Sequence, residues 1–544
     1  MIQASMIRVA LAAALLSLAG IAWTTEGPPT RGGETMLNVK DFQNVPSLTG
    51  GIQETVDALP ETGGLVFIPP GTYLLHRQIQ LPDHVELVGA GRATVLKKDD
   101  EFCLRLTEDA RKGQDYVIVD DGSRVTPGIY VAVGDDKLHN RITYFSEGFV
   151  KSVEGNRINL TCTMQRDYAR DGDARLMNQF PIVVPGRNCL IRDLAMDGNR
   201  AHQTQRRRKD LVGWLSTGVY NMGKQSKVVN CWIYDMLQDG IMYCDYESGV
   251  VSNCTIYGNG NMGIHLGGGP KAIIIGNEVF NNSSDGIYLC YGNWGIVVNG
   301  NVIHHNAGNG IGGISRGDPT RDSTDDRYGV FSNNVIFRNG LSGIHADPGA
   351  RDVIITGNVC MDNGQRNGRA AGIFLEGAST CIVSNNRCLD DQDTPARPLA
   401  EDARAGQSEV TMVETGLNEC RIQAGQRVKV CAGSRSEIQT VTEVRRTGHH
   451  RYALTLGGAL QHDYTAKPEG KLVPQKSQAW GIIEGWSREE GGENVITGNI
   501  CRGNLLGDIL WSGRDTQVHG NVGKAVPIKP ERSRDTYFPA PWDK

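Results

Sequence analysis

Short apolar segments alternate with turns of Asn and Gly through most of the second half of the chain. Segments such as "SKVVN", "AIIIGN", "DVIITGN" and "NVITGN" recur, and three short strands separated by polar turns make up each unit. Successive segments are 23, 24, 24, 33, 24, 28, 113 and 22 residues apart, measured between their closing residues Asn230, Asn253, Asn277, Asn301, Asn334, Asn358, Asn386, Asn499 and Asn521. Three strands in such a short unit are typical of one coil of a parallel β-helix.

This periodicity predicts an all-β, right-handed parallel β-helix whose successive coils stack about 4.8 Å apart. Ile, Val and Leu would fill its interior, and the recurring Asn residues would form a ladder in one turn. A propeller fits poorly, because each of its blades needs four strands and about 40 residues. We predict that Asn277, Asn301, Asn358 and Asn499 occupy equivalent inward positions.

Two stretches that resemble each other interrupt the coils. "LTEDARKGQ" at residue 106 and "LAEDARAGQ" at residue 399 share seven of their nine residues, and both stretches end on related segments, "QRDYARDG" and "QHDYTAKP". Alternating runs between these points predict two small β-barrel-like inserted domains. Each insert either seals the coil stack or forms a carbohydrate-binding wall, and the low aromatic content favours the seal.

The N-terminal segment reads as an export signal. Arg8, an apolar run and small residues before Trp23 predict a signal peptide and a secreted or periplasmic protein. No later apolar run has the length of a membrane span. The expected order is a signal peptide (1–22), N-terminal cap and first coils (37–103), first insert (104–180), central coils (181–392), second insert (393–477), last coils (478–525) and a tail (526–544).

The start of the coil region carries a resemblance to a known family. Residues 50–97, with "GGIQETVDALPETGGLVFIPPGTYLL" and "VELVGAG", resemble the opening of the pectate-lyase/polygalacturonase-like superfamily, in which a short amphipathic helix caps the β-helix. Residues 181–392 also resemble the right-handed β-helix repeat family. The resemblance implies the fold more than the activity. The Gly-His-Gly and Arg-Ile-Lys motifs of polygalacturonases and the Asp-His strand signature of pectate lyases are missing.

Aligning the Gly-Ile strands of successive coils predicts which side chains face outward. Ile at the second position points into the core, so the third and fifth positions point out. The third position gives the column Tyr220, Met242, His265, Tyr288, Gly312, His345, Phe374 and Ile483, and the fifth gives Cys244, Gly267, Cys290, Ile314, Asp347 and Glu376. His345 and Asp347 therefore share one outer face, and Glu376 follows one coil later. Asp239 and Asp285, which precede "GI", are interpreted as turn residues.

Long loops flank this face on both sides, and long loops on a rigid scaffold often bind ligands. Segments 199–214 and 364–371 precede Gly-Ile strands, whereas 315–329 follows one. They supply the candidate substrate-binding residues Arg206, Arg207, Arg208, Arg316, Arg321, Arg366 and Arg369. These cations suit an anionic polysaccharide or oligosaccharide. The net charge of −5 selects neither nucleic acid nor membrane as a partner.

Three functions fit these residues. In hydrolysis, Asp347 and Glu376 would share the acid and nucleophile or base roles, and this stacked carboxyl pair favours a glycosidase. In a polysaccharide lyase or epimerase, Tyr288, His265 or His345 would carry the proton removed from a uronic acid unit. A non-catalytic carbohydrate-binding or surface protein is the third. No cofactor is expected, except that Asp318, Asp322, Asp325 and Asp326 could hold calcium; their neighbouring arginines weaken that idea.

Overall fold

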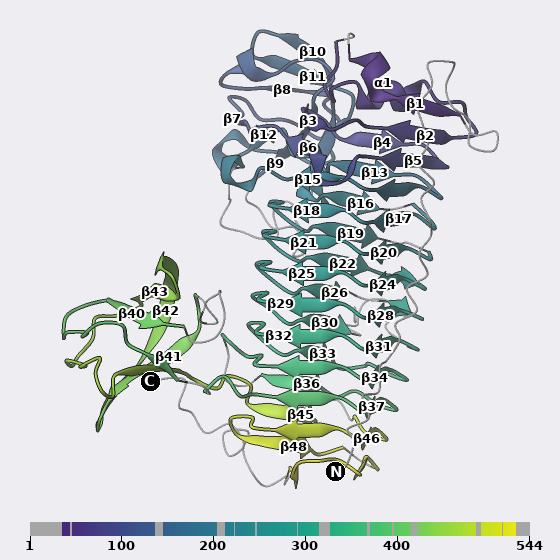
Figure 1. The fold of residues 1–544 in the computed structure, drawn as a ribbon. Helices are drawn as coiled ribbons and strands as arrows, with labels where there is room; N and C mark the ends of the chain where they lie inside the picture. Colours follow the sequence, from purple (N-terminus) through teal and green to yellow (C-terminus); the bar gives the residue numbers. More distant parts are fainter. Residues whose placement is uncertain are drawn as a thin grey trace, which may run out of the picture.

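The computed structural model describes most of the chain (Figure 1). The described residues are 35–43, 46–135, 145–203, 213–221, 223–244, 247–290, 292–314, 327–366, 370–393, 396–414, 422, 424–485, 491–513 and 515–528. The expected signal peptide and most of the expected tail lie outside them.

Three long parallel sheets form the faces of one coil stack, which confirms the predicted right-handed β-helix. The sheet called the front sheet, whose strand labels run down the middle of the stack in Figure 1, contains β4 (Ile79–Leu81), β13 (Val183–Pro185), β16 (Val219–Asn221), β19 (Ile241–Cys244), β22 (Ile264–Gly267), β26 (Ile287–Leu289), β30 (Ile311–Ile314), β33 (Ile344–Ala346), β36 (Ala371–Leu375), β45 (Trp480–Glu484), β48 (Gly507–Trp511) and β50 (Ala525–Pro527). Strand β50 extends the stack two residues into the expected tail.

The other two faces lie to either side of the front sheet. The left sheet contains β3 (Gly71–Leu75), β6 (Thr94–Lys98), β15 (Ala195–Asp197), β18 (Trp232–Tyr234), β21 (Thr255–Tyr257), β25 (Glu278–Phe280), β29 (Val302–His304), β32 (Val335–Phe337), β35 (Val359–Met361), β38 (Arg387–Leu389) and β47 (Ile500–Arg502). The right sheet contains β1 (Met36–Asn38), β2 (Gly64–Phe67), β5 (Val85–Val88), β14 (Leu190–Arg192), β17 (Lys227–Val229), β20 (Val250–Ser252), β24 (Ile273–Ile275), β28 (Val297–Asn299), β31 (Val330–Ser332), β34 (Ile354–Thr356), β37 (Ile382–Ser384), β46 (Val495–Thr497) and β49 (Gln517–His519).

Each coil runs from the right sheet to the left sheet and then to the front sheet. The turn between the left and front sheets is called the entry corner, and the turn between the front and right sheets the exit corner. Alternation along each short strand buries one residue and exposes its neighbours, as at Ile273–Ile275, where only Ile274 is buried. The buried residues of all three sheets form one continuous apolar core. Helix α1 (Ile52–Asp57) packs at the N-terminal end, where a cap was expected.

A ladder of asparagine side chains lines the turn between the right and left sheets. Asn277 donates from Nδ2 to Oδ1 of Asn301 at 3.0 Å, and its backbone N–H donates to the same oxygen at 2.9 Å. The same pair of bonds continues through Asn334, Asn358, Asn386, Asn499 and Asn521. The predicted inward positions of Asn277, Asn301, Asn358 and Asn499 are therefore confirmed.

Two residues placed in that column by sequence do not belong to it. Asn230 and Asn253 adopt positive φ values of 51° and 54°, which Asn tolerates better than most residues. They hold the left-handed turn position that Gly276 and Gly300 hold in later coils. The inward position in these two coils is taken by Cys231 and Cys254, which are buried. All the cysteines among the described residues are free thiols.

Both inserts leave the stack at the entry corner, between a strand of the left sheet and a strand of the front sheet. The first contains β7 (Cys103–Arg105), β8 (Tyr116–Ile118), β9 (Tyr130–Gly134), β10 (Ser146–Glu154), β11 (Arg157–Leu160) and β12 (Arg175–Met177). The second contains β39 (Arg397–Pro398), β40 (Glu409–Val413), β41 (Arg427–Ala432), β42 (Arg435–Gly448), β43 (Arg451–Leu456) and β44 (Lys471–Pro474).

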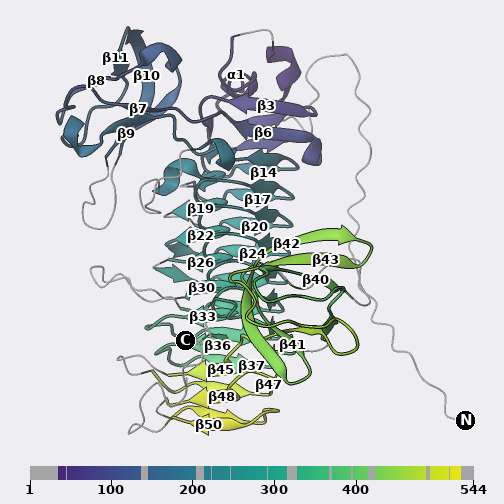
Figure 2. The same cartoon turned by 90° about the vertical axis from the view of Figure 1, so that its left-hand side faces the viewer.

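The two inserts have the same antiparallel strand order. The first runs β7-β12-β9-β10-β11-β8 and the second runs β39-β44-β41-β42-β43-β40, so each strand of one has a counterpart in the other. Each insert also has its own apolar core. In Figure 1 both inserts lie to the left of the stack at different heights, whereas in Figure 2 the first projects to the left of the stack and the second lies in front of it.

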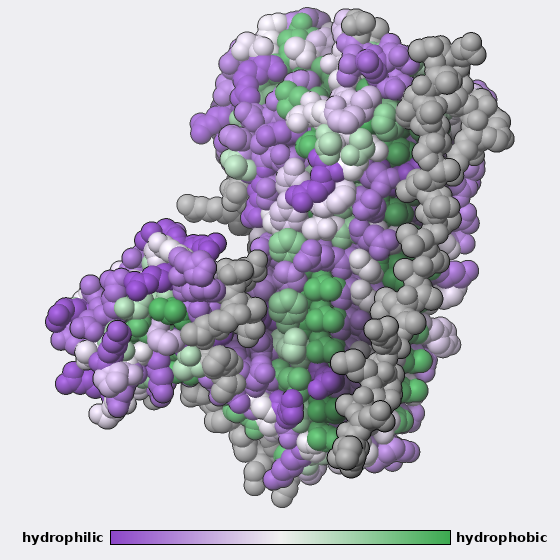
Figure 3. Space-filling model, in the orientation of Figure 1, coloured by the Kyte–Doolittle hydropathy of each residue, from purple (hydrophilic) through white to green (hydrophobic). Residues whose placement is uncertain are grey.

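The outer surface differs between the stack and the second insert. In Figure 3 apolar residues form a vertical run on the face turned to the viewer, whereas the second insert is mainly hydrophilic on the side shown. On the left sheet, the rings of Tyr234, Tyr257, Phe280, His304 and Phe337 stack in sequence at 4.7–5.2 Å between centroids. Because most of these ring faces pack on one another, they offer little surface for stacking on sugars. No helix among the described residues is long and apolar enough to cross a membrane.

Candidate active site

The outward column predicted on the Gly-Ile strands lies on the outer face of the front sheet. His265 pairs in register with Tyr288, Tyr288 with Gly312, and His345 with Phe374. The column is more covered than an open sheet surface, since Tyr288 and Phe374 are each only 8% exposed. The side chains of His345, Asp347 and Glu376 keep between 18% and 28% of their surface in contact with solvent.

His345 joins the two carboxylates that sequence reasoning placed beside it. Its Nε2 lies 3.1 Å from Oε2 of Glu376, and its Nδ1 lies 3.4 Å from Oδ1 of Asp347. The ring also stacks on Phe374, with 4.9 Å between centroids and 16° between planes. Contacts on both nitrogens and on one face fix the orientation of the imidazole. The three residues predicted to converge are therefore in contact.

A pair of glycines interrupts the column of outward side chains between Tyr288 and His345, and neighbouring side chains fill the space beside them. A Cβ atom at Gly312 would lie 2.8 Å from Oδ2 of Asp285, and one at Gly313 would lie 2.5 Å from Cε2 of Tyr288. Such approaches are too close for a real side chain, so only glycine leaves room here for the Asp285 carboxylate and the Tyr288 ring. The ring of Tyr288 consequently leans over Gly313, toward the strand that carries His345.

The same glycines correct one position of the predicted outer face. Ile314 was expected to point outward, but it is only 1% exposed and pairs with Ala346 in the core. The register shifts between Ile311 and Ile314, where Gly313 adopts a φ of 70°. One extra residue in a strand reverses the direction of the side chains that follow it.

Asp285, interpreted from sequence as a turn residue, packs against Gly312. Its Oδ1 accepts a hydrogen bond from the backbone N–H of Asn309. Burial, with a smaller contribution from Asp347, outweighs the lowering effect of the Asn309 hydrogen bonds and of His345, and the pKa of Asp285 is raised to about 6. Asp285 is therefore electrostatically linked to the His345 group. The sequence signal for Asp285 was that the next coil has Gly312 at the outward position, where the neighbouring coils have Tyr288 and His345.

His265, another predicted proton carrier, is held in an ion pair. Its Nδ1 lies 2.9 Å from Oδ2 of Asp239, a carboxyl group that is only 3% exposed. Burial opposes the charge on the imidazole, but the Asp239 carboxylate and, to a smaller extent, Cys290 together outweigh burial and raise the pKa of His265 to about 10. A histidine that is protonated at neutral pH has no free lone pair with which to remove a proton, so His265 is not suited to act as a base.

Most of the predicted arginines cannot be placed. Arg206, Arg207, Arg208, Arg316, Arg321 and Arg369 lie outside the described residues. Arg366 is described, and it lies exposed at the entry corner, beside Gly340. Two arginines that sequence reasoning did not single out, Arg327 and Arg351, pair in adjacent coils at the exit corner and line a cavity of about 490 Å³.

The same group offers donor atoms for a cation. One ligand atom each from His345, Asp347 and Glu376 lies within 4.8 Å of the others. A donor set of one imidazole and two carboxylates suits a transition metal better than calcium, which prefers oxygen ligands alone. The four aspartates of the expected calcium loop, Asp318, Asp322, Asp325 and Asp326, lie outside the described residues.

Comparisons with known proteins agree with this architecture. The family model described as "Right handed beta helix region" matches residues 207–320, and that of "Rhamnogalacturonase A/epimerase, pectate lyase-like" matches residues 38–148. No curated protein sequence matches the chain.

Solved structures with a similar fold include two A-modules of mannuronan C-5 epimerases from Azotobacter vinelandii. One is 16% identical with a TM-score of 0.50, the other 14% identical with a TM-score of 0.47, and both matches cover 91% of this chain and 100% of the module. An exopolygalacturonase from Thermotoga maritima is 13% identical over 66% of this chain and 88% of its own, with a TM-score of 0.40. The predicted resemblance is thus confirmed: the chain folds as a right-handed parallel β-helix, and two of its segments match the right-handed β-helix and pectate lyase-like family models.

Proposed function

We propose that this protein is an enzyme that acts on acidic polysaccharides. It removes the proton from the carbon next to the carboxylate of a uronic acid unit, as an epimerase or a lyase does. The observation that carries the proposal is that Tyr288 and His345 lie on the outer face of the front sheet, with Gly312 and Gly313 on the strand between them. The strands of Tyr288 and His345 are two coils apart, so their backbones are about 9–10 Å apart at the usual strand spacing. A sugar unit bound across this part of the face would have one proton carrier on each side.

The chemistry needs few groups. One proton carrier takes the proton from C5, and the electron pair of the broken C–H bond moves into the carboxylate of the sugar. In an epimerase, the second carrier then returns a proton to the opposite face of C5. In a lyase, the electron pair instead expels the oxygen at C4. Asp285, with a pKa of about 6, is partly protonated near neutral pH and can donate a hydrogen bond to the carboxylate as charge develops there.

Hydrolysis by Asp347 and Glu376, which the sequence favoured, finds less support in the geometry. Both carboxylates contact the same imidazole, and donor oxygens of the two lie within 4.8 Å of each other. Glycosidases keep their two carboxyl groups about 5–5.5 Å or about 6.5–9.5 Å apart, with the sugar bond between them. We assign Asp347 and Glu376 to the orientation of His345.

Hydrolysis remains the second candidate because of one observation. A buried carboxyl group with a raised pKa is the usual general acid of a glycosidase, and Asp285 has this property. In that case Asp347 would act as the second carboxylate. The names of the compared proteins are compatible with either chemistry, since they include mannuronan epimerases and an exopolygalacturonase. We further propose export of the protein, on the basis of the apolar segment at residues 1–22.

The test is incubation of the purified protein with a panel of polyuronates in D₂O. Deuterium at C5 without chain cleavage indicates epimerisation. New reducing ends together with the absorbance of an unsaturated product indicate elimination, and new reducing ends without absorbance or deuterium indicate hydrolysis. No change in any polymer would contradict an enzyme of this class and favour a binding protein.

Two variants locate the reaction. Tyr288→Phe and His345→Gln should each lower deuterium incorporation by about 10²–10⁴-fold, the usual contribution of a proton carrier. His84→Gln, at an exposed histidine near the N-terminal end of the stack, is the matched control and should retain full activity. Activity that survives both site variants would place the reaction elsewhere.

A further inference from the structure

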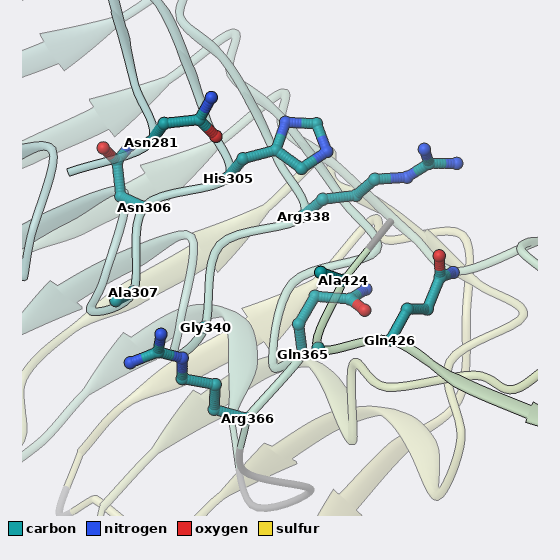
Figure 4. A pocket seen from close by; sticks show the side chains of 11 residues that line it. Asn281, His305, Asn306, Ala307, Arg338, Gly340, Gln365, Arg366, Ala424 and Gln426 are labelled. Carbon is teal, nitrogen blue, oxygen red and sulfur yellow. The ribbon is translucent and has the colours of Figure 1, made fainter. Parts of the chain in front are cut away.

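A cavity of about 350 Å³ lies where the second insert meets the entry corner (Figure 4). The coil stack contributes Asn281, His305, Arg338 and Arg366, and the insert contributes the segment Ala424–Gln426. The cavity belongs to the same coils as the candidate active site. Asn281 lies four residues before Asp285, and Arg338 lies seven residues before His345. It is nevertheless on another face, on the far side of the entry corner.

The positive charge of the cavity comes from its two arginines. Arg366 is exposed, and no carboxylate among the described residues pairs with it. Arg338 lies 3.5 Å from Asp362 and is partly neutralised by it. His305 adds no charge, because burial, with help from His304 and Arg338, lowers its pKa to about 3. The guanidinium groups of Arg338 and Arg366 extend toward opposite sides of Figure 4, so the cavity has one cation at each end.

Uncharged polar groups lie between the two cations. Nε2 of Gln365 lies 2.7–3.0 Å from the backbone oxygen of Asp362, Oε1 of Gln392 and Oγ of Ser477, and these contacts fix the amide and leave its Oε1 to accept a hydrogen bond from a ligand. The exposed Asn281 adds a second amide. Guanidinium groups bind carboxylates, whereas amides bind hydroxyl groups. This combination matches a molecule that carries both groups.

The wall supplied by the insert is tied to the stack. Nε2 of Gln426 donates to Oε1 of Gln392 at 2.7 Å, and the same oxygen accepts from Gln365 at 3.0 Å. Gln392 thus links a residue of the insert to a residue of the coil across the floor of the cavity. The insert is held against the stack in a way that keeps the cavity formed.

We propose that this cavity is a second carbohydrate-binding site, which holds a stretch of an acidic polysaccharide with successive carboxylates near Arg338 and Arg366. A cation at each end suits a chain with repeated carboxylates better than a single small anion, which would reach only one of them. The choice of ligand class rests on the proposed function, but binding here requires no chemistry. The second insert then serves as a binding wall and not only as a seal.

The test is calorimetric binding of hexagalacturonate and hexamannuronate to the full-length protein. The Glu376→Gln variant serves as the background, so that turnover does not consume the probe. We expect at least one hexauronate to bind, and maltohexaose, galacturonic acid and inorganic phosphate to bind at least about tenfold more weakly. Arg366→Gln should weaken hexauronate binding about tenfold, since it removes a charge-assisted hydrogen bond. Arg366→Lys should retain most of the affinity.

Arg404→Gln is the matched control, because it removes an exposed arginine of the same insert that does not line the cavity. It should bind as the background does. Equal hexauronate affinity in the Arg366→Gln variant would overturn the proposal, as would phosphate or maltohexaose binding as tightly as the hexauronates. Arg366-dependent binding without turnover of any polymer by the wild type would leave this site standing and remove the proposed function. Turnover of a polymer by the wild type, together with hexauronate binding that does not depend on Arg366, would support the proposed function and remove this site.

Discussion

Asp239 and Asp285 occupy the same place in different coils, and only Asp239 has a histidine opposite it. Oδ1 of Asp239 accepts from the backbone N–H of Met262 at 2.9 Å, as Oδ1 of Asp285 accepts from Asn309. Oδ2 of Asp239 then binds His265, whereas Oδ2 of Asp285 faces Gly312. One coil thus contains a closed ion pair, and the other contains a carboxyl group with a raised pKa that packs against a glycine.

A side chain at Gly312 should strongly reduce activity. A Cβ atom at residue 312 would lie 2.8 Å from the Asp285 carboxylate and displace it. We expect Gly312→Ala to lower turnover about 10²-fold, the cost of a misplacement of about 1 Å, while the thermal melting curve stays close to that of the wild type. Gly448→Ala is the control, since a Cβ there would meet nothing closer than 3.7 Å. Full activity in Gly312→Ala would show that the substrate does not bind at this part of the face.

The buried Asp285 carboxyl should make stability depend on pH. Its pKa is raised from about 3.8 to about 6, so its effect on stability is fully present below pH 3.8 and is lost as the pH rises to about 6. We expect Asp285→Asn to unfold like the wild type near pH 4 and to be about 2–3 kcal/mol more stable at pH 7. Urea denaturation at both pH values measures this. A difference that does not change with pH would contradict the raised pKa.

The contribution of the Asp239–His265 pair to the free energy of unfolding should also be lost as the pH rises, but at higher pH than that of Asp285. The pKa of His265 is raised to about 10, so its stabilising effect is complete below about pH 6.5 and is lost as the pH rises through 10. At pH 6, His265→Gln should cost about 3–5 kcal/mol, because it leaves a buried carboxylate unpaired. The double variant Asp239→Asn/His265→Gln should recover part of that loss. If His265→Gln lowered the free energy of unfolding equally at pH 6 and at pH 10, this would argue against a charged Asp239–His265 pair.

The asparagine ladder offers a matched pair of neighbouring residues. Asn334 accepts from the backbone and the amide of Asn301 and donates to Val298 and Asn358. Asn334→Ala should therefore cost at least about 1–3 kcal/mol, the price of one unsatisfied buried group. Asn333, at a φ of 55° in the turn, needs only a residue that tolerates this conformation. Asn333→Gly should change the free energy of unfolding by no more than about 0.5 kcal/mol.

Local periodicity was enough to predict the coils, the inward asparagines and the meeting of His345, Asp347 and Glu376. Each of these follows from the alternation of side chains along a short strand and from the stacking of coils in register. The bulge at Gly313 was missed because "NGIGGIS" has the pattern of an ordinary strand. Its extra residue becomes visible only when the strand is paired with those of the adjacent coils.

The roles of Asp285 and of the cavity at Arg366 could not be predicted in the same way. The pKa of Asp285 depends on how deeply its carboxyl group is buried, which is a property of the folded coil and not of the letters beside it. The cavity brings Asn281 next to Ala424, and nothing in the repeat indicates where the second insert comes to rest against the stack.

The asparagine ladder also shows how little the stack is affected by what is inserted between its coils. Asn386 and Asn499 are 113 residues apart, yet the two hydrogen bonds between them measure 3.0 Å each. The same two bonds between Asn277 and Asn301, which are only 24 residues apart, measure 2.9 and 3.0 Å. Closing a loop costs only about 0.6 kcal/mol more for each doubling of its length, and an insert with its own core supplies its own folding energy. A coil boundary at the entry corner is therefore a position at which whole domains can be gained, duplicated or exchanged during evolution while the neighbouring coils keep their register.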